Sequence, residues 1–250
     1  MQHELLARDY RAFTDGDDEI TVAMVRRNEY ESLSIAFEEV DPNIEDEILE
    51  AYERATEGGP DLYLFGLANI FHELKIPECF ITDIVDCVNY YYDCLVNVDI
   101  DESNKLHLVV LRLLEAFTIS DFPSKSIIDI VDVDKLVKRL LILVKFRNFY
   151  DVILENWQLV VFAAKGSDDL SFEGIINYKL TLKDMKKIKD KVNTDSDNKN
   201  NVASDSVLID MISCSSIESL DFDIQKIKNG SFVSIKDFAS VLGRIGELLE

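Results

Sequence analysis

The chain contains few of the residues that interrupt helices. Its 250 residues include 9 glycines and 4 prolines. Both counts are low for this length, so we expect few tight turns and a mostly helical protein. Apolar residues make up 47% of the chain. That fraction is enough for a sizeable core and argues against global disorder.

Cysteine is also scarce, and no apolar run is long. The cysteines form no CxxC motif and no zinc-spaced group with histidine, so we expect reduced, buried thiols and a cytosolic or nuclear protein. The beginning, "MQHELLARDYRAF", lacks the apolar segment of a signal peptide, and the apolar runs are too short to span a bilayer. We therefore expect no membrane contact. The four cysteines are Cys79, Cys87, Cys94 and Cys214.

Basic residues are outnumbered by acidic ones. The chain has 26 lysines and arginines against 48 aspartates and glutamates, a net charge of −22. Phosphate backbones and anionic lipids repel such a chain, so no direct contact with nucleic acid is expected. The acid excess either serves solubility alone or steers basic amphipathic helices toward the protein.

No catalytic constellation is recognisable. No nucleophile motif lies near the histidines His3, His72 and His107, and there is no glycine-rich phosphate loop. His72 lies in an apolar helical stretch and is expected to be a packed or surface residue. We expect no enzymatic activity and no cofactor. Trp157, the single tryptophan, is expected in the core, with groove lining as the alternative.

An internal repeat is the most informative feature. "LTLKDMKKI" and "VSIKDFASV" share the order apolar, Ser or Thr, apolar, Lys, Asp, apolar. In each copy the hydroxyl and the acid have the spacing of a capping box, Thr181 with Asp184 and Ser234 with Asp237. An amphipathic helix follows each box.

Looser copies of the repeat occur at "VDVDKLVKRL", "LYLFGLANI" and "LHLVVLRLL". Each of the five copies has one apolar residue, a possible cap, which is Asp132 in "VDVDKLVKRL", and a helix, and four of the five follow an upstream helical pattern. A helix, a loop, one bridging residue and a second helix form the EF-hand arrangement. Generic short amphipathic helices are the alternative. The bridging residues would be Leu62, Leu106, Val131, Leu180 and Val233.

The expected loops are poor in calcium ligands. An EF-hand loop places oxygen ligands at positions 1, 3 and 5 and a bidentate glutamate at position 12. In "DIDESNKLHLVV", Asp99, Asp101 and Ser103 hold the first three, but position 12 is Val110. Lys135 stands at position 12 of the loop bridged by Val131. Lys226 and Lys228 stand at positions 1 and 3 of the loop bridged by Val233, and an ammonium has no lone pair for a cation. We therefore expect no metal site.

The expected organisation is all-α, with two lobes of paired degenerate EF-hand-like helix–loop–helix units. Residues 1–40 are predicted to be a partly disordered extension with a helix near 30–40. Residues 41–148 form the N-terminal lobe with an insertion, beginning with a helix that Asp41 caps and Pro42 opens. Residues 149–250 form the C-terminal lobe, with a mobile loop over 193–206.

Four segments carry a resemblance to a known family. "IEDEILEAY", "LTLKDMKKI", "DMISC" and "DFASVLGRIGEL" follow one another between residues 44 and 250. With them the chain resembles the Rad33 family of yeast nucleotide-excision-repair accessory proteins. The resemblance implies a centrin- and calmodulin-like fold with degenerate EF-hands. Extra sequence between Pro77 and Val131 leaves Leu106 and Val131 as alternatives for the second bridging residue, and motif order favours Val131.

The resemblance also implies a function. The chain would be a non-enzymatic nuclear subunit that binds a C-terminal helix of the xeroderma-pigmentosum-C-type damage-recognition protein, beside or in place of centrin. The ubiquitin-like-domain partner of that protein is a further candidate partner. The alternatives are a calcium-responsive centrin-like helix-binding protein that uses the Asp99 loop, and a helical scaffold subunit of another complex.

The expected binding site is an apolar groove of the C-terminal lobe, because both strong copies of the repeat lie there. An amphipathic partner helix places its anchors in such a groove at i, i+3, i+4 and i+7. Calcium is not needed, so binding is expected to be constitutive. The sequence does not separate groove residues from core residues. The candidates are Met185, Ile188, Met211, Ile212, Phe238, Val241, Leu242 and Ile245.

Overall fold

The computed structural model describes residues 36–56, 59, 61–96, 104–120, 128–166, 170–194, 204–218 and 231–248. Within these ranges the backbone forms helices joined by isolated bridges, which confirms the predicted all-α class. Contacts divide the chain into a larger unit, residues 40–242, and a smaller unit, residues 1–39 with 243–250. Most of the predicted N-terminal extension lies outside the described residues, and residues 36–38 are helical.

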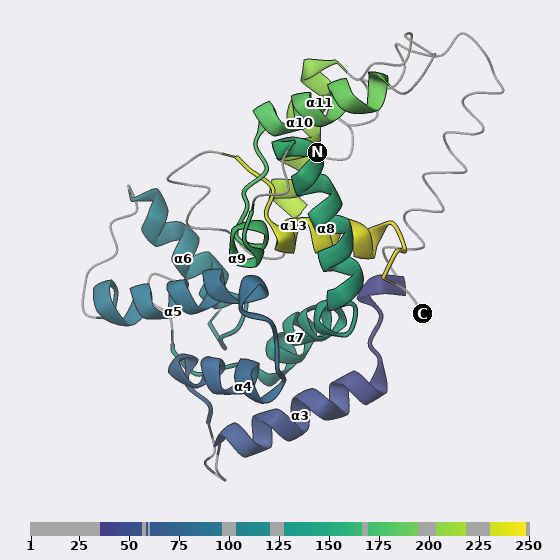
Figure 1. The fold of residues 1–250 in the computed structure, drawn as a ribbon. Helices are drawn as coiled ribbons and strands as arrows, with labels where there is room; N and C mark the ends of the chain where they lie inside the picture. The colour runs from purple at the N-terminus through teal and green to yellow at the C-terminus, as the bar shows by residue number, and fades with distance from the viewer. Residues whose placement is uncertain are drawn as a thin grey trace, which may run out of the picture. The chain divides into compact units, whose positions relative to one another are not determined.

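The first part of the larger unit is built from short helices (Figure 1). The Asp41 carboxylate accepts from the amide of Asn43 at 2.8 Å, and the first helix begins at Pro42 as predicted. α3 packs against α4 and α7, and α5 packs against α6. The elements are α3 (Pro42–Thr56), η2 (Leu64–Gly66), α4 (Leu67–Glu73), η3 (Glu78–Phe80), α5 (Thr82–Cys94), α6 (Lys105–Glu115) and α7 (Val133–Asn148).

The second part of the chain contains the helices of the two strong repeats. α10 packs against α8 and α11. The mobile loop predicted over 193–206 is shorter than expected, because α10 continues to Thr194 and α11 begins at Asp205. Residues 195–203 of that loop lie outside the described residues. The elements are α8 (Tyr150–Lys165), α9 (Phe172–Ile176), α10 (Leu182–Thr194), α11 (Asp205–Glu218) and α13 (Ile235–Arg244).

A single residue separates α7 from α8. Phe149 ends α7 and precedes α8, with φ −102° and ψ 19°. The Phe80 ring lies against both helices, with centroids 5.3 Å from Phe146 and 5.9 Å from Tyr150. α8 ends at Gly166, whose φ of 74° is a left-handed conformation that glycine adopts without strain. The predicted lobe boundary at 148/149 coincides with this one-residue junction, and the two-lobe division stays a prediction.

The first pair of predicted bridging residues lie opposite each other. Tyr63 and Ile130 form an antiparallel bridge, and the Val131 amide donates to the Leu62 carbonyl at 2.7 Å. Leu106, the alternative, instead lies in the first turn of α6, where its amide donates to the Asn104 side chain. Val131 is therefore the residue that pairs with the Leu62 segment.

The second pair of predicted bridging residues also lie opposite each other. Leu180 and Val233 form an antiparallel bridge in which each amide donates to the other carbonyl at 2.9 Å. α10 begins two residues after Leu180, and α13 begins two residues after Val233. The bridge therefore sets the starts of these helices side by side. The assignment of these units as EF-hand-like stays a prediction.

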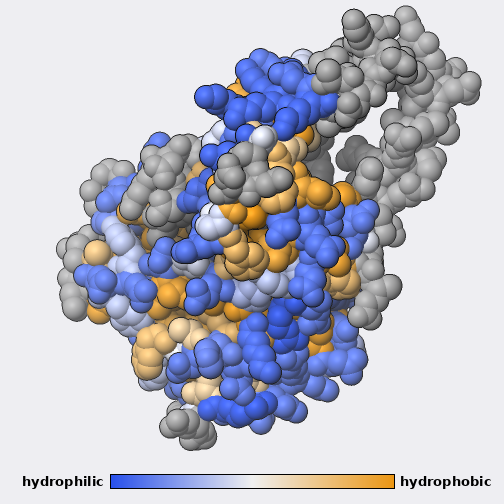
Figure 2. Space-filling model, in the orientation of Figure 1, coloured by the Kyte–Doolittle hydropathy of each residue, from blue (hydrophilic) through white to orange (hydrophobic). Residues whose placement is uncertain are grey.

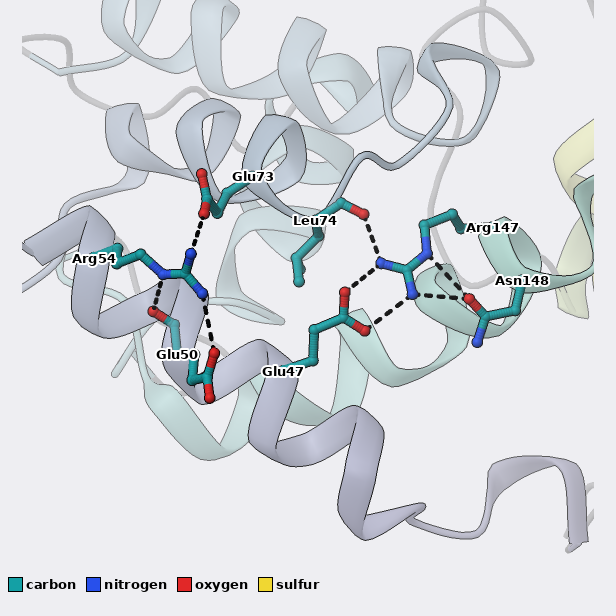
Figure 3. Close-up of polar contacts among 7 residues, drawn as sticks. All are labelled: Glu47, Glu50, Arg54, Glu73, Leu74, Arg147 and Asn148. Atoms are coloured by element: carbon teal, nitrogen blue, oxygen red, sulfur yellow. Dashed lines mark hydrogen bonds and ion pairs between the residues drawn. The ribbon is translucent and has the colours of Figure 1, made fainter.

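Arg147 joins three helices of the larger unit (Figure 3). It donates from α7 to both carboxylate oxygens of Glu47 on α3, at 2.6 and 2.9 Å, and to the carbonyl of Leu74 after α4, at 2.8 Å. The hydrogen bond from Arg147 lowers the pKa of Glu47. Arg54 on α3 also pairs with Glu73 on α4 at 2.7 Å, but both side chains are largely exposed, so this second pair contributes little.

Phe37 and Gly243 belong to the smaller unit and lie close together. The Phe37 side chain is fully buried, and its ring occupies the space that a Cβ atom at Gly243 would need. Glycine at this position of α13 therefore allows the close approach of the ring.

No helix in the described part of the chain combines the length and apolar character needed to cross a membrane.

Candidate partner-binding surface

The predicted binding residues are distributed over three helices. Met185 and Ile188 lie on α10, and Met211 and Ile212 lie on α11. The other four, of which Ile245 follows the end of the helix, belong to the α13 region. Ile245 is exposed and is part of the smaller unit.

Burial separates core residues from surface residues in this set. Ile212 and Leu242 are 4% and 8% exposed, so they belong to the core. Met211 is 49% exposed. The remaining predicted binding residues in the larger unit are half-buried, with part of each side chain at the surface. We call the exposed and half-buried members the C-terminal apolar surface; they are Met185, Ile188, Met211, Phe238 and Val241.

Hydrophobic side chains reach the molecular surface in this region. Figure 2 shows orange, hydrophobic surface around α8 and α9, below the blue surface of α10 and α11. Among the individual residues, Leu159 on α8 and Phe172 on α9 are strongly exposed. Contiguous apolar surface of this kind is typical of an interaction site.

Capping boxes fix the first turns of α10 and α13. Before α13, the Asp237 amide donates to Ser234 Oγ at 3.2 Å, and the Ser234 amide and hydroxyl both donate to Asp237 Oδ2 at 2.8 Å. Before α10, the Thr181 amide and hydroxyl donate to Asp184 Oδ2 at 3.1 and 2.7 Å. Both predicted boxes are therefore formed, although the amide of the acid donates to the hydroxyl of Ser234 in one and to the backbone carbonyl of Thr181 in the other.

Trp157 packs beneath Phe238, a residue of the C-terminal apolar surface. It is fully buried, which confirms the prediction of a core residue. Its indole Nε1 donates to the Ile175 carbonyl at 2.8 Å, joining α8 to α9. Its ring lies 5.4 Å from that of Phe238. Phe238 thus rests on a fixed indole while part of its own ring reaches the surface.

Polar contacts hold α10 on its neighbours. Lys187 Nζ donates to the Ala164 carbonyl near the end of α8 at 3.3 Å, and Lys186 pairs with Asp205 of α11 at 2.7 Å. Burial raises the pKa of Asp184, but the hydrogen bonds from Thr181 and Tyr178 outweigh burial, so the net pKa is lowered. Asp184 is therefore ionised at neutral pH and remains a cap.

A buried ion pair anchors α13 to the first part of the larger unit. Lys236 Nζ lies 2.9 Å from both carboxylate oxygens of Asp83 on α5, and the two side chains are 7% and 14% exposed. Removing one partner would leave a buried charge uncompensated, which is costly. The pair therefore fixes α13 relative to α5.

The Lys135 ammonium donates hydrogen bonds to the end of α6 and the segment that follows it. Lys135 Nζ donates to the carbonyl oxygens of Glu115, Thr118 and Ser120 at 3.3, 2.8 and 3.0 Å. Asp132, the predicted cap of α7, accepts from the Lys135 amide at 3.0 Å. Position 12 of this loop therefore carries a positive charge that the backbone itself coordinates.

The described residues provide little for metal or nucleophilic chemistry. They contain no group of three or more His, Cys, Asp or Glu side chains placed to hold a metal ion. Asp99, Asp101 and Ser103 lie outside the described residues. Burial raises the pKa of Cys79 to about 12, so its thiol is protonated at neutral pH and is a weak nucleophile. His72 is exposed, in agreement with its interpretation as a packed or surface residue.

Sequence reasoning missed two features of the structure. The Lys236–Asp83 pair joins residues 153 positions apart, and no local pattern indicates it. The exposed aromatic residues Tyr63 and Phe65 were also missed, although "LYLF" has a signal: Leu62 and Leu64 are buried, and the residues that alternate with them are exposed.

Comparisons with known proteins give one match. The model of the Rad33 family matches residues 34–197. No curated protein and no solved structure matches the chain. The matched range covers α3 to α10 and includes Met185 and Ile188, whereas "DMISC" and "DFASVLGRIGEL" lie beyond its end.

The match covers more than half of the chain and includes the Leu62–Val131 pair and the first residue of the Leu180–Val233 bridge. The chain therefore belongs to the Rad33 family, a family of accessory factors with a role in nucleotide excision repair.

Proposed function

We propose that this chain is a non-enzymatic subunit of the damage-recognition complex of nucleotide excision repair. It acts in the nucleus and binds a C-terminal helix of the xeroderma-pigmentosum-C-type damage sensor on the C-terminal apolar surface, without calcium. Membership in the Rad33 family supports the repair role. The observation that carries the binding proposal is the Leu180–Val233 bridge, which starts α10 and α13 side by side with half-buried apolar side chains.

The chemistry of this surface fits an amphipathic helix. Met185 and Ile188 are one turn apart on α10, and Phe238 and Val241 are one turn apart on α13, so each helix offers a short apolar row. Burying each such side chain contributes about 1.5–3 kcal/mol before the costs of association. The net charge of −22 speeds the encounter with a basic helix.

Calcium independence has its own support in the turn between α6 and α7. Calcium sensors open when the ion binds to acidic loop ligands. Here the ammonium of Lys135 already donates to three backbone carbonyls of the turn. At the second bridge, the Asp184 and Asp237 carboxylates cap their own helices. These contacts, made by the protein's own side chains at the described ends of the loops, support binding without calcium.

Isothermal titration with the C-terminal helix of the damage sensor tests the proposal. We expect equal, tight binding in calcium and in chelator. Binding that requires calcium would favour the sensor alternative. No binding in either buffer would refute the proposed partner.

Variants locate the site. Phe238→Ala is expected to weaken binding about tenfold, because it removes a ring that packs on Trp157 and reaches the surface. Leu108→Ala, at an exposed apolar position on α6, is the matched control. Asp99→Ala is expected to leave affinity unchanged.

Leu242→Asp is unsuitable as a binding test, because Leu242 is buried and its substitution would destabilise the fold. Equal affinity of folded Phe238→Ala and wild type would refute the location.

A further inference from the structure

A second apolar surface lies at the other bridge. Three short extended segments pair there: Tyr63 faces Ile130, and Thr118 faces Val131. In antiparallel pairing the next position is also matched, and the Ile119 amide donates to the Ile130 carbonyl at 3.1 Å. Tyr63, Ile130 and Ile119 therefore form a row across the three segments on one face.

This row faces solvent. Tyr63 and Ile119 are 41% and 45% exposed, whereas Thr118 and Val131, on the opposite face, are buried. Alternation between the two faces of an extended segment places one set in the core and the other at the surface. The row thus belongs to the outer face of the three segments.

Aromatic rings extend the row. Phe65, the most exposed of them at 65%, stacks on Tyr63 with ring centroids 5.8 Å apart and planes within 3° of parallel. Tyr92 of α5 meets Phe65 edge to face at 6.2 Å. The Leu64 amide donates to the Asp129 carbonyl, and the next residue of each segment, Phe65 and Ile128, is exposed. In Figure 2 a pale orange area interrupts the blue surface between α4 and α5.

We call these residues the aromatic patch; they are Tyr63, Phe65, Tyr92, Ile119, Ile128 and Ile130. Exposed apolar groups that are contiguous, unlike scattered ones, mark interaction sites.

Carboxylates border the aromatic patch. The Tyr92 hydroxyl donates to Asp129 Oδ2 at 3.1 Å, which orients this carboxylate beside the rings. Asp61, two residues before Tyr63, and Asp93, next to Tyr92, are both exposed. The nearby Lys135 ammonium is directed to backbone carbonyls instead. Asp129 therefore supplies an acid at the rim of the patch, and the exposed Asp61 and Asp93 lie near patch residues in the sequence.

We propose that the aromatic patch binds a segment of a partner protein in which arginine or lysine side chains flank apolar ones. A cation stacks on the exposed ring of Phe65 through cation–π attraction, and arginine suits this best because its guanidinium is planar. The acids of the rim pair with neighbouring basic residues, and the isoleucines take up the apolar side chains.

Charge decides between this partner and a second copy of the chain. Two copies would bring net charges of −22 together, and like charges repel. A basic segment is attracted by the same field. The aromatic patch lies within the residues that the family model matches, and none of its residues belongs to α10, α11 or α13. It gives the protein a binding surface besides the one proposed for the damage-sensor helix.

The test measures binding of the full chain to a fluorescein-labelled probe peptide in which arginines alternate with leucines. Its twin carries glutamate in place of arginine. Fluorescence anisotropy is expected to show binding of the arginine peptide and none of the twin. Phe65→Ala is expected to weaken the arginine peptide about tenfold. Because this substitution leaves the net charge unchanged, it separates the patch from non-specific attraction to an acidic protein.

Phe172→Ala is the matched control, since Phe172 is 57% exposed on α9. Its affinity for the arginine peptide is expected to equal that of wild type. Thermal melts verify that both variants fold, and Tyr63→Ala supplies a second substitution within the patch. Equal affinity of Phe65→Ala and wild type, equal binding of the two peptides, or no binding at all would overturn the proposal.

The single tryptophan distinguishes the two surfaces. Trp157 lies against Phe238, so its emission reports on the C-terminal apolar surface. The unlabelled arginine peptide is expected to leave this emission unchanged. A shift in Trp157 emission, together with full affinity in Phe65→Ala, would place the peptide on the C-terminal apolar surface. That result overturns the aromatic patch and leaves the proposed function intact.

Discussion

The two bridges of the larger unit are both antiparallel but are stabilised by different groups. At Leu180–Val233, the stabilising side chains are local. Asp184 and Asp237 lie in the first turns of α10 and α13, and each accepts hydrogen bonds from the residue just before its helix. At Leu62–Val131, a third segment pairs alongside, and Lys135 donates to carbonyls 15 to 20 residues earlier. One bridge depends on local capping, and the other on tertiary contacts.

Lys135→Met is expected to have the largest effect on this comparison. It leaves three carbonyl oxygens of the turn without their ammonium donor, and we expect a loss of about 3 kcal/mol in the free energy of unfolding. Urea denaturation measures the loss. Lys138→Met, an exposed position on the same helix, is the control and should change stability by less than about 0.5 kcal/mol. Equal losses in the two variants would show that the ammonium is not a structural group.

Ser234→Ala and Thr181→Ala compare the two caps of the second bridge. The Ser234 hydroxyl donates to the acid and accepts from its amide, whereas the Thr181 hydroxyl donates to the acid and the Asp184 amide bonds to the Thr181 carbonyl. We expect Ser234→Ala to cost about 1–2 kcal/mol and Thr181→Ala less than about 1 kcal/mol. Chemical denaturation gives both values. The reverse order would mean that the additional hydrogen bond to Ser234 does not contribute.

Acidification is expected to act on both regions, but more strongly on the second. The pKa of Asp184 is lowered from 3.8 and that of Glu47 from 4.5, so the unfolded chain binds these protons first. Their stabilising contributions are complete above those ordinary values and are lost as the pH falls through the lower values of the folded state.

The slope of stability against pH measures this effect in variants that cannot titrate. Asp184→Asn is expected to flatten the acid limb more than Glu47→Gln, because the Asp184 side chain is 9% exposed and the Glu47 side chain is 43% exposed. An unchanged slope in Asp184→Asn would show that this cap does not contribute to acid sensitivity.

Local patterns were sufficient to predict helix starts and bridge positions. The caps at Asp132 and Ser234 and the bridging residues Leu180 and Val233 follow from short-range spacing, and the structure places them as expected. The same patterns predicted too long a loop after α10, because the polar sequence "NTDSDNKNN" begins before the helix ends. Helix ends are poorly marked where no glycine or proline follows.

The candidate site was less predictable. Amphipathic spacing placed Leu242 and Val241 on the same apolar stripe, yet Leu242 is buried and Val241 is half-buried. A stripe shows which side of a helix is apolar, but neighbouring helices decide how much of it they cover. The aromatic patch was overlooked for the same reason, since three segments far apart in the chain must pair before its rows exist.

The sequence by itself determined the all-α class, the starts of the principal helices and the bridging residues Leu180 and Val233, because these depend on short-range patterns. Only the tertiary structure decided that the Leu62 segment pairs with Val131 and not with Leu106. Only the tertiary structure decided which apolar side chains reach the surface and where the Lys135 ammonium is directed. It also decided that Lys236 pairs with Asp83, 153 residues away. Burial and long-range ion pairs depend on which elements pack together, and the periodicity of a single segment does not contain that information.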